Sequence, residues 1–200
     1  MKLLSAGASP FARKVRVLLH ESGRADAVEV VDVVTGPLQT DPQVAAANPV
    51  GKIPALIRDD GPAIYDSRVI CRYLDDRLDT GLYPAARLWE ILTLEATADA
   101  IMDAAILIVY EHRIRPLEKV FEPWEEAQFA KVERCVRAAN ESWMSHLNGP
   151  LDMGHIAMAC ALGYLDLRHP GCNWREGNGA LDDWYAAFSE RDSMRATVPA

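Results

Sequence analysis

The stretch Asn48-Pro49-Val50-Gly51-Lys52-Ile53-Pro54-Ala55-Leu56 combines two prolines, a glycine and a lysine with a following apolar run. A residue before proline favours extended backbone, so Asn48 and Ile53 are expected to be extended, with a turn at Gly51 between them. Proline cannot donate a hydrogen bond to a sheet, so the Ile53 backbone is expected to stay free to pair with something else. A cis Ile53–Pro54 bond would hold that geometry. Taken alone, the stretch favours a rigid turn before an ordinary strand.

The bulk properties are those of a globular protein. The chain has 200 residues, enough for one large domain or two small ones. Its formal net charge of −8 argues against nucleic acid or an anionic membrane as a partner. We expect a cytoplasmic protein, because no apolar run has the length of a membrane span and no signal-peptide pattern opens the chain. Cys71, Cys135, Cys160 and Cys172 lack metal-ligand spacing, so we expect reduced thiols and no metal.

Strand and helix patterns alternate over the first 78 residues. The expected elements are a strand over 2–6, a helix from 10 that closes at 22–23, a strand over 28–34, a short helix over 42–47, strands over 54–57 and 63–65 joined as a hairpin, and a helix from 67. Ser9 is a good N-cap with Pro10 in the first helical position, and Asp66-Ser67 caps the last helix. This βαβ-ββα order fits a small α/β sandwich.

Beyond a connector over residues 79–84, the pattern is helical only. The expected helices cover 88–110, 123–147, 153–165 and 181–188. Asp152 is the expected N-cap of the third of these helices. His155 stands where a capping box has Glu or Gln, so the box is expected to be incomplete and His155 to be a polar residue near the cap. The sequence therefore predicts an α/β domain over 1–78, a linker over 79–84 and an all-helical domain over 85–200.

Three motifs, in this order, resemble the glutathione transferase superfamily. They are Ser9-Pro10-Phe11 at the first helix start, Asn-Pro-x-Gly-Lys-Ile-Pro over 48–54, and the Asp66-Ser67 cap. The helical half and the closing segment 188–197 are similar to that family as well, so the resemblance covers essentially the whole chain. It is closest to small bacterial members with a serine-type site. It implies a thioredoxin-like N-terminal domain, an all-helical C-terminal domain, a homodimer, and glutathione as a substrate.

The resemblance also implies roles for individual residues. The Ile53 backbone would pair, strand-like, with the cysteinyl unit of glutathione, and Pro54 in cis would present that backbone. Ser67 at a helix N-terminus would bind the γ-glutamyl carboxylate, Asp66 the ammonium group, and Lys52 would lie near the glycine carboxylate. Outside the family context, Asp66-Ser67 is an ordinary helix cap and Lys52 a solvated lysine.

Ser9 matches the position of the thiol-activating hydroxyl. A thiol with a pKa of about 8.5 is only a few per cent thiolate at pH 7, and lowering that pKa by about two units requires about 2.7 kcal/mol. One hydroxyl hydrogen bond to an anion, about 1.5–3 kcal/mol, with a helix N-terminus, about 0.3–1 kcal/mol, is of that size. The alternative is that Ser9 is only an N-cap, because one hydroxyl would have to do two jobs. Ser9 and Ala12 replace the two cysteines of a redox motif, which excludes dithiol exchange there.

The second substrate is less well defined. Phe11 is assigned to the glutathione site, and Ser9–Phe11 with the long helix around Met102–Tyr110 would form the electrophile pocket. Polar side chains near that helix fit solvation or helix-dipole roles better than function, so none is assigned; they are Asp103, His112, Arg113 and Arg115.

The sequence therefore predicts a detoxification enzyme, a glutathione transferase that attacks a small electrophile with the activated glutathione thiolate. Two alternatives stay open. One is a catalytically weak glutathione-binding or regulatory protein of the same fold, since folds host unrelated functions. The other is a glutathione-dependent isomerase or dehalogenase.

Overall fold

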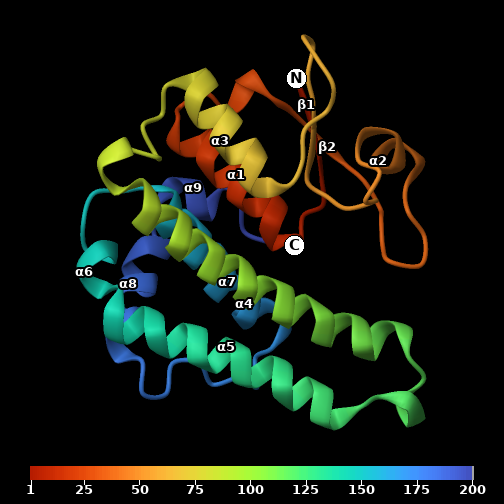
Figure 1. The fold of residues 1–200 in the computed structure, drawn as a ribbon, viewed down its shortest axis with the longest axis vertical. Coiled ribbons are helices and arrows are strands. Elements are labelled where there is room, and N and C mark those ends of the chain that lie inside the picture. The colour runs from red at the N-terminus through yellow and green to blue at the C-terminus, as the bar shows by residue number, and fades with distance from the viewer. Residues whose placement is uncertain (200) are drawn as a thin grey trace. The chain divides into compact units, whose positions relative to one another are not determined.

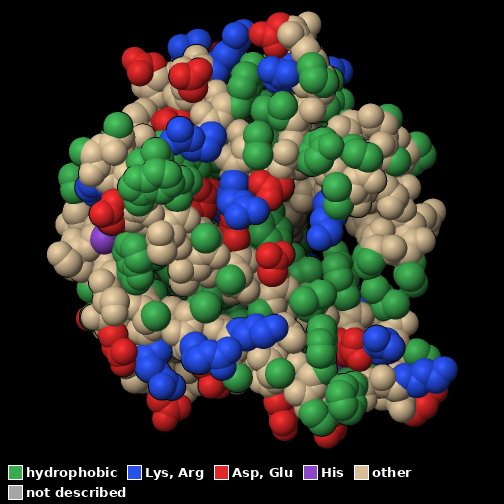
Figure 2. Space-filling view, viewed as in Figure 1, with side chains coloured by type: hydrophobic (Ala, Val, Ile, Leu, Met, Phe, Trp, Pro, Cys, Tyr) green, Lys and Arg blue, Asp and Glu red, His purple; other side chains and the backbone are tan. Residues whose placement is uncertain are grey.

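The computed structural model describes residues 1–199, which form two compact units (Figure 1). One unit is Met1–Ala85 together with the chain from Glu190 onward, and the other is Ala86–Ser189. None of the helices within residues 1–199 combines the length and the hydrophobicity of a membrane-spanning segment. Figure 2 shows acidic and basic side chains interspersed over the face in view.

The first unit contains a three-stranded sheet in the order β2-β1-β3. The strands are β1 (Lys2–Ser5), β2 (Glu29–Asp32) and β3 (Ala55–Ile57). In β1, Leu3 lies opposite Val30 of the parallel strand β2 and opposite Leu56 of the antiparallel strand β3. This mixed sheet confirms the thioredoxin-like layout that the sequence predicted.

The predicted returning strand over 63–65 is wrong in extent. Only a single bridge forms, in which Leu56 and Ile64 exchange two backbone hydrogen bonds of 2.9 Å each. Pro62 has no N–H to extend the pairing on one side, and Asp66 already caps the next helix on the other. The chain therefore touches β3 at one residue pair and then turns into the helix.

Three helices complete the first unit. They are α1 (Pro10–Glu21), α2 (Pro42–Ala47) and α3 (Ser67–Leu78), with one 3₁₀ turn at Ala25–Ala27. As predicted, Ser9 and Asp66 are the N-caps of α1 and α3, and Asp41 is the N-cap of α2; each accepts a backbone N–H with its side chain. Helices α1 and α3 pack together, and α2 packs on β3 in a buried cluster with Leu4 and Val33.

The closing segment packs on helix α1. It contains the short helix α9 (Asp192–Arg195). The Glu21 carboxylate accepts hydrogen bonds of 2.7 Å from both Nε and Nη2 of Arg191, and buried Arg13 donates to the Met194 carbonyl at 3.1 Å. The predicted ranges differ here, because they assigned everything from 85 to 200 to the helical domain.

The second unit is all-helical. Its helices are α4 (Leu88–Ile114), α5 (Glu122–Ser142), α6 (Met144–Leu147), α7 (Met153–Arg168) and α8 (Gly179–Ser189), with 3₁₀ turns at Ala85–Arg87 and Leu117–Lys119. Helix α7 is buried from Met153 to Leu165 and packs against α4 and α8. The helix predicted over 123–147 is in fact α5 and α6, which meet at Trp143. No glycine or proline lies at that break, so the spacing of apolar residues predicted one continuous helix across it.

Asp152 organises the start of α7. Its Oδ1 accepts the Gly154 N–H at 3.0 Å and lies 2.8 Å from His155 Nδ1, while Oδ2 lies 2.8 Å from His146 Nε2 and 3.4 Å from Arg87 Nη1. The prediction of an incomplete capping box was wrong, because His155 Nδ1 also reaches the Asp152 backbone N–H at 3.3 Å. Burial alone raises the pKa of Asp152, but the hydrogen bond and charge of His155, with His146 and Arg87, lower it below its usual value.

We expect Asp152→Ala to lower the free energy of unfolding of the helical unit by about 3 kcal/mol, because a cap is lost and its buried partners are left uncompensated. A group with a lowered folded pKa stabilises above its ordinary pKa and loses that effect as pH falls through the folded value. The difference from wild type should therefore shrink below about pH 4. All five tryptophans lie within Ala86–Ser189, so urea unfolding followed by tryptophan fluorescence reports this unit. Exposed Asp183→Ala is the control, and equal losses in both variants would contradict the cap's role.

Candidate functional site

A buried asparagine holds the loop that precedes β3. Asn48 is 3% exposed, and its Nδ2 donates to the Lys52 carbonyl at 2.7 Å while its Oδ1 accepts the Val50 N–H at 2.9 Å. Asn48 was predicted only as an extended residue before proline and as part of the 48–54 motif, so this role was missed. The available signal was the tendency of Asn to bond to the backbone two residues on. The loop is thus braced from inside the protein.

The predicted turn and cis bond are both present. Gly51 has φ +72°, and its N–H donates to the Asn48 carbonyl at 2.8 Å. A Cβ at Gly51 would lie 3.0 Å from Thr40 Oγ1, so the turn favours glycine twice. The Ile53–Pro54 peptide bond is cis. Neither the N–H nor the C=O of Ile53 has a hydrogen-bond partner among residues 1–199, as the sequence predicted.

Ser9 uses only one end of its hydroxyl group. As the N-cap of α1, its Oγ accepts the Ala12 N–H at 3.3 Å. Within residues 1–199 the Ser9 hydroxyl proton is donated to no other residue. A hydroxyl has one donor and two acceptor sites, so capping leaves the donor available. The Ser9 hydroxyl is therefore able to cap α1 and to donate a hydrogen bond to a thiolate at the same time.

The N-terminus of α3 carries Asp66 and Ser67. Asp66 Oδ1 accepts the Arg68 N–H at 3.0 Å, and Oδ2 pairs with Arg68 Nη2 at 3.0 Å. Burial raises the pKa of Asp66, but the hydrogen bonds and charge of Arg68 outweigh it and lower that pKa. Ser67 is 3% exposed, and its hydroxyl has no hydrogen-bond partner among the described residues. This helix end offers a hydroxyl and backbone N–H groups to an anion.

The strand registers bring these features to one end of the sheet. Leu4 pairs with Ala55, so the chain that leaves β1 toward Ser9 runs past the Ile53–Pro54 bond. Leu56 pairs with Ile64, so the antiparallel chain returns toward Pro54 as it approaches Asp66. The Ser9 loop, Ile53–Pro54 and the α3 N-terminus therefore converge.

Two further predicted residues border this end of the sheet. Phe11 lies half-buried in the first turn of α1, two residues after Ser9. The Lys52 side chain is exposed on the braced loop, and only its backbone carbonyl is tied down, by Asn48. Phe11 and Lys52 therefore lie beside the region where the Ser9 loop, Ile53–Pro54 and the α3 N-terminus come together.

Three side chains of the helical unit are close enough to hold a metal ion. Donor atoms of His146, Asp152 and His155 lie within 4.8 Å of one another. Both histidine nitrogens, however, lie 2.8 Å from a carboxylate that caps α7 and faces Arg87. A cation would have to displace these partners, so the cluster is explained by capping.

Two family models match this chain. Residues 8–77 match the glutathione S-transferase N-terminal domain, and residues 122–187 match the glutathione S-transferase C-terminal domain. This chain belongs to the glutathione S-transferase family. The resemblance carried by the three motifs is confirmed.

Several similar proteins match this chain over its whole length. An uncharacterized GST-like protein, YibF of Escherichia coli K12, is 31% identical over 100% of this chain and 98% of its own. A glutathione transferase family member from Pseudomonas fluorescens Pf-5, solved with bound glutathione, is 42% identical with a TM-score of 0.97, covering 100% of this chain and 98% of that one. A second Pf-5 structure, with bound S-(propanoic acid)-glutathione, is 41% identical with a TM-score of 0.92 and 100% coverage of both chains.

We expect the two hydrogen bonds of Asn48 to be separable. Asn48→Ala removes both, so amide exchange at Val50 should become about tenfold faster. Asn48→Asp keeps the acceptor for Val50 but loses the donor to Lys52, so Val50 should stay protected while residues 52–53 loosen. Hydrogen exchange read by NMR measures both effects. The control is exposed Gln43→Ala on nearby α2; unchanged Val50 exchange in Asn48→Ala would contradict the bracing role.

Proposed function

We propose that this protein is a glutathione transferase that conjugates the glutathione thiolate to an electrophilic small molecule. The observation that carries the proposal is the convergence of the Ser9 hydroxyl, the free Ile53 backbone and the α3 N-terminus in a member of this family. Each protein feature then faces one part of glutathione. The Ser9 hydroxyl faces the thiol, the Ile53 backbone faces the peptide unit, and the α3 N-terminus faces the α-amino acid end.

Glutathione binding follows from these features. The Ile53 N–H and C=O pair with the cysteinyl peptide unit, and cis Pro54 presents that backbone edge. The γ-glutamyl carboxylate bonds to the Ser67 hydroxyl at the positive end of α3. Asp66, ionised because its pKa is lowered, attracts the γ-glutamyl ammonium, and Lys52 attracts the glycine carboxylate. Phe11 adds an apolar contact near the sulfur.

The chemistry needs a thiolate rather than a protein nucleophile. Ser9 donates its free proton as a hydrogen bond to the glutathione sulfur, and this lowers the thiol pKa. The sulfur electron pair then forms a bond to the electrophilic carbon. Either a leaving group departs with its bonding pair, or a conjugated double bond takes the charge and is protonated by water. Ser9 is unchanged at the end.

The ligand of the second Pf-5 structure supports conjugation rather than glutathione binding without turnover. In S-(propanoic acid)-glutathione the sulfur carries a carbon substituent, as a conjugation product does. A glutathione-binding regulatory protein would share the site but lack turnover, and an isomerase or dehalogenase would share the thiolate but release glutathione again. We further propose a cytoplasmic homodimer with a role in detoxification, and sequence domains over 1–78 and 85–200 joined by the linker 79–84.

Three substitutions at Ser9 separate capping from thiol activation. Glycine is nearly as good an N-cap as serine, so Ser9→Gly keeps the helix but removes the hydroxyl, whereas Ser9→Ala removes both. We expect both variants to lose about 10- to 150-fold in kcat/KM at pH 7, the equivalent of one hydrogen bond to an anion at about 1.5–3 kcal/mol. Ser9→Thr keeps a hydroxyl and should retain most activity.

The measurement is the pH–rate profile with 1-chloro-2,4-dinitrobenzene and with acrylate. A raised thiol pKa shifts the rising limb to higher pH, so the gap between wild type and Ser9→Gly should close near pH 10. A Ser9→Gly profile identical to wild type would leave Ser9 as a cap only. Tight glutathione binding without turnover of any electrophile in the intact protein would favour the regulatory alternative.

The proposed contact between Ser67 and the γ-glutamyl carboxylate is tested by removing either partner, the hydroxyl from the protein or the γ-glutamyl unit from the ligand. We expect Ser67→Ala to weaken glutathione binding about tenfold, because one hydrogen bond to a carboxylate is lost. Cysteinylglycine lacks the γ-glutamyl unit, so its affinity should be the same for wild type and variant. Isothermal titration measures both, with exposed Ser142→Ala as the control. Absence of any glutathione binding at millimolar concentrations in wild type would refute the proposed function.

A further inference from the structure

The backbone of Ser9 is held from both sides. Its N–H donates to the Ala6 C=O at 3.0 Å, which closes a β-turn before the helix. Its C=O accepts the Arg13 N–H at 3.0 Å as α1 begins. Ser9 is extended, with φ −77° and ψ 118°, as expected for a residue before Pro10. The position of its hydroxyl therefore depends on the conformation of the turn that precedes it.

Gly7 lies in the middle of that turn and has more backbone freedom than the turn uses. Its φ is not positive, and a Cβ at Gly7 would meet no atom within 4 Å. Neither the backbone nor the available space therefore requires a glycine here. Glycine nevertheless has access to conformations that other residues avoid, so a separate contact is needed to hold the turn in one of them.

A guanidinium group supplies that contact. Among the contacts of half-buried Arg16, its Nη2 donates to the Gly7 carbonyl, nine positions earlier, at 3.1 Å. Long side chains in a helix point back toward its N-terminus, which explains how Arg16 reaches the turn before α1. The helix dipole gives no reason for a cation here, because it favours positive charge at the other end of a helix.

The direction of the Gly7 carbonyl matters for a neighbouring thiolate. A carbonyl oxygen carries partial negative charge, so one that turned toward the glutathione sulfur would oppose ionisation of the thiol. A carbonyl that is bonded to Arg16 is not free to turn in this way. The contact therefore has an electrostatic consequence as well as a mechanical one.

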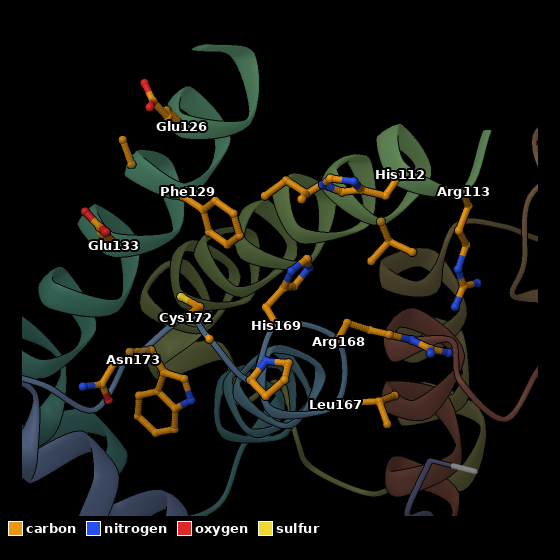
Figure 3. Close-up of a pocket in the computed structure, with 16 residues that line it drawn as sticks. His112, Arg113, Glu126, Phe129, Glu133, Leu167, Arg168, His169, Cys172 and Asn173 are labelled. Carbon is orange, nitrogen blue, oxygen red and sulfur yellow. The ribbon is translucent and has the colours of Figure 1, made fainter. Parts of the chain in front are cut away.

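The residues of this contact do not line the cavity of the helical unit. That cavity has a volume of about 930 Å³ and is lined by residues that all fall within 108–174 (Figure 3). Gly7, Ser9 and Arg16 belong to the first unit. A substitution at Arg16 therefore removes no side chain that lines the cavity, and its effect on activity is expected to arise at the turn.

We propose that Arg16 is a positioning residue for thiol activation, an inference that rests on the proposed function. By holding the Gly7 carbonyl, Arg16 keeps the turn in the conformation that directs the Ser9 hydroxyl to the glutathione sulfur. Arg16 touches neither glutathione nor the electrophile and acts through the turn. Loss of the contact shortens the time for which Ser9 donates to the sulfur, so the pKa of the bound thiol rises.

Arg16→Gln tests this role through the ionisation of the thiol. We expect kcat/KM with 1-chloro-2,4-dinitrobenzene at pH 7 to fall about tenfold, and the rising limb of the pH–rate profile to move up by about one pH unit. S-Methylglutathione has no ionisable thiol, so its affinity in isothermal titration should be unchanged. A general loosening of the site would weaken its binding as well. Arg24→Gln, at an exposed arginine of the same unit, is the control and should change neither quantity.

Two double variants separate positioning from the charge of Arg16. In a Ser9→Gly background, Arg16→Gln should cause no further loss, because the hydroxyl that it positions is absent. A direct effect of the guanidinium charge on the sulfur would persist in that background. Gly7→Ala should recover part of the activity of Arg16→Gln, because alanine lacks the extra backbone conformations of glycine.

Thermal unfolding shows which variants fold. If Arg16→Gln does not fold, Arg16→Lys takes its place, since it keeps the charge but loses the planar fork, and it should give a smaller shift in the same direction. The inference is overturned if the folded variant keeps the wild-type pH profile, if S-methylglutathione binding falls equally, if the loss adds to that of Ser9→Gly, or if Gly7→Ala recovers nothing. Wild type that turns over no electrophile would refute the proposed function itself.

Discussion

The buried amide of Asn48 is the interaction on which the site in the first unit depends. It binds the Lys52 carbonyl and the Val50 N–H together, two polar groups of the loop just before Ile53. Val50, Gly51 and Lys52 each use one backbone group within the loop, whereas Ile53 uses neither its N–H nor its C=O among residues 1–199. Leaving polar backbone unpaired is costly unless water or a ligand completes it. The Ile53 backbone is thus available to pair with one more short extended segment.

In the proposed function, Ser9 serves helix stability and thiol activation together. Helix capping consumes an acceptor, whereas thiolate stabilisation consumes a donor, and a hydroxyl offers both. Asp66 also has more than one role, because it caps α3 and pairs with Arg68 while it remains charged. In each case the helix start positions the group, so that changes in local helix stability and in ligand affinity are linked.

Much of the first unit could be predicted from single residues. The caps at Ser9, Asp41 and Asp66 and the turn at Gly51 follow from local backbone preferences, which sequence records directly. The bridge at Leu56–Ile64 and the bracing by Asn48 depend on where distant segments pair, and no local pattern reports that. His155 was misjudged because the side chain that completes a capping box was expected to be Glu or Gln.

The attachment of the closing segment to α1 has a consequence for the order in which the chain acquires structure. The unit Ala86–Ser189 is continuous and is fully synthesised before the segment that starts at Glu190. The first unit is interrupted, since Arg191 and Met194 supply partners for Glu21 and Arg13, which are synthesised before the helical unit. On a ribosome, the helical unit is therefore able to fold while the first unit still lacks its final contacts. The first unit is therefore completed only after the helical unit has been synthesised.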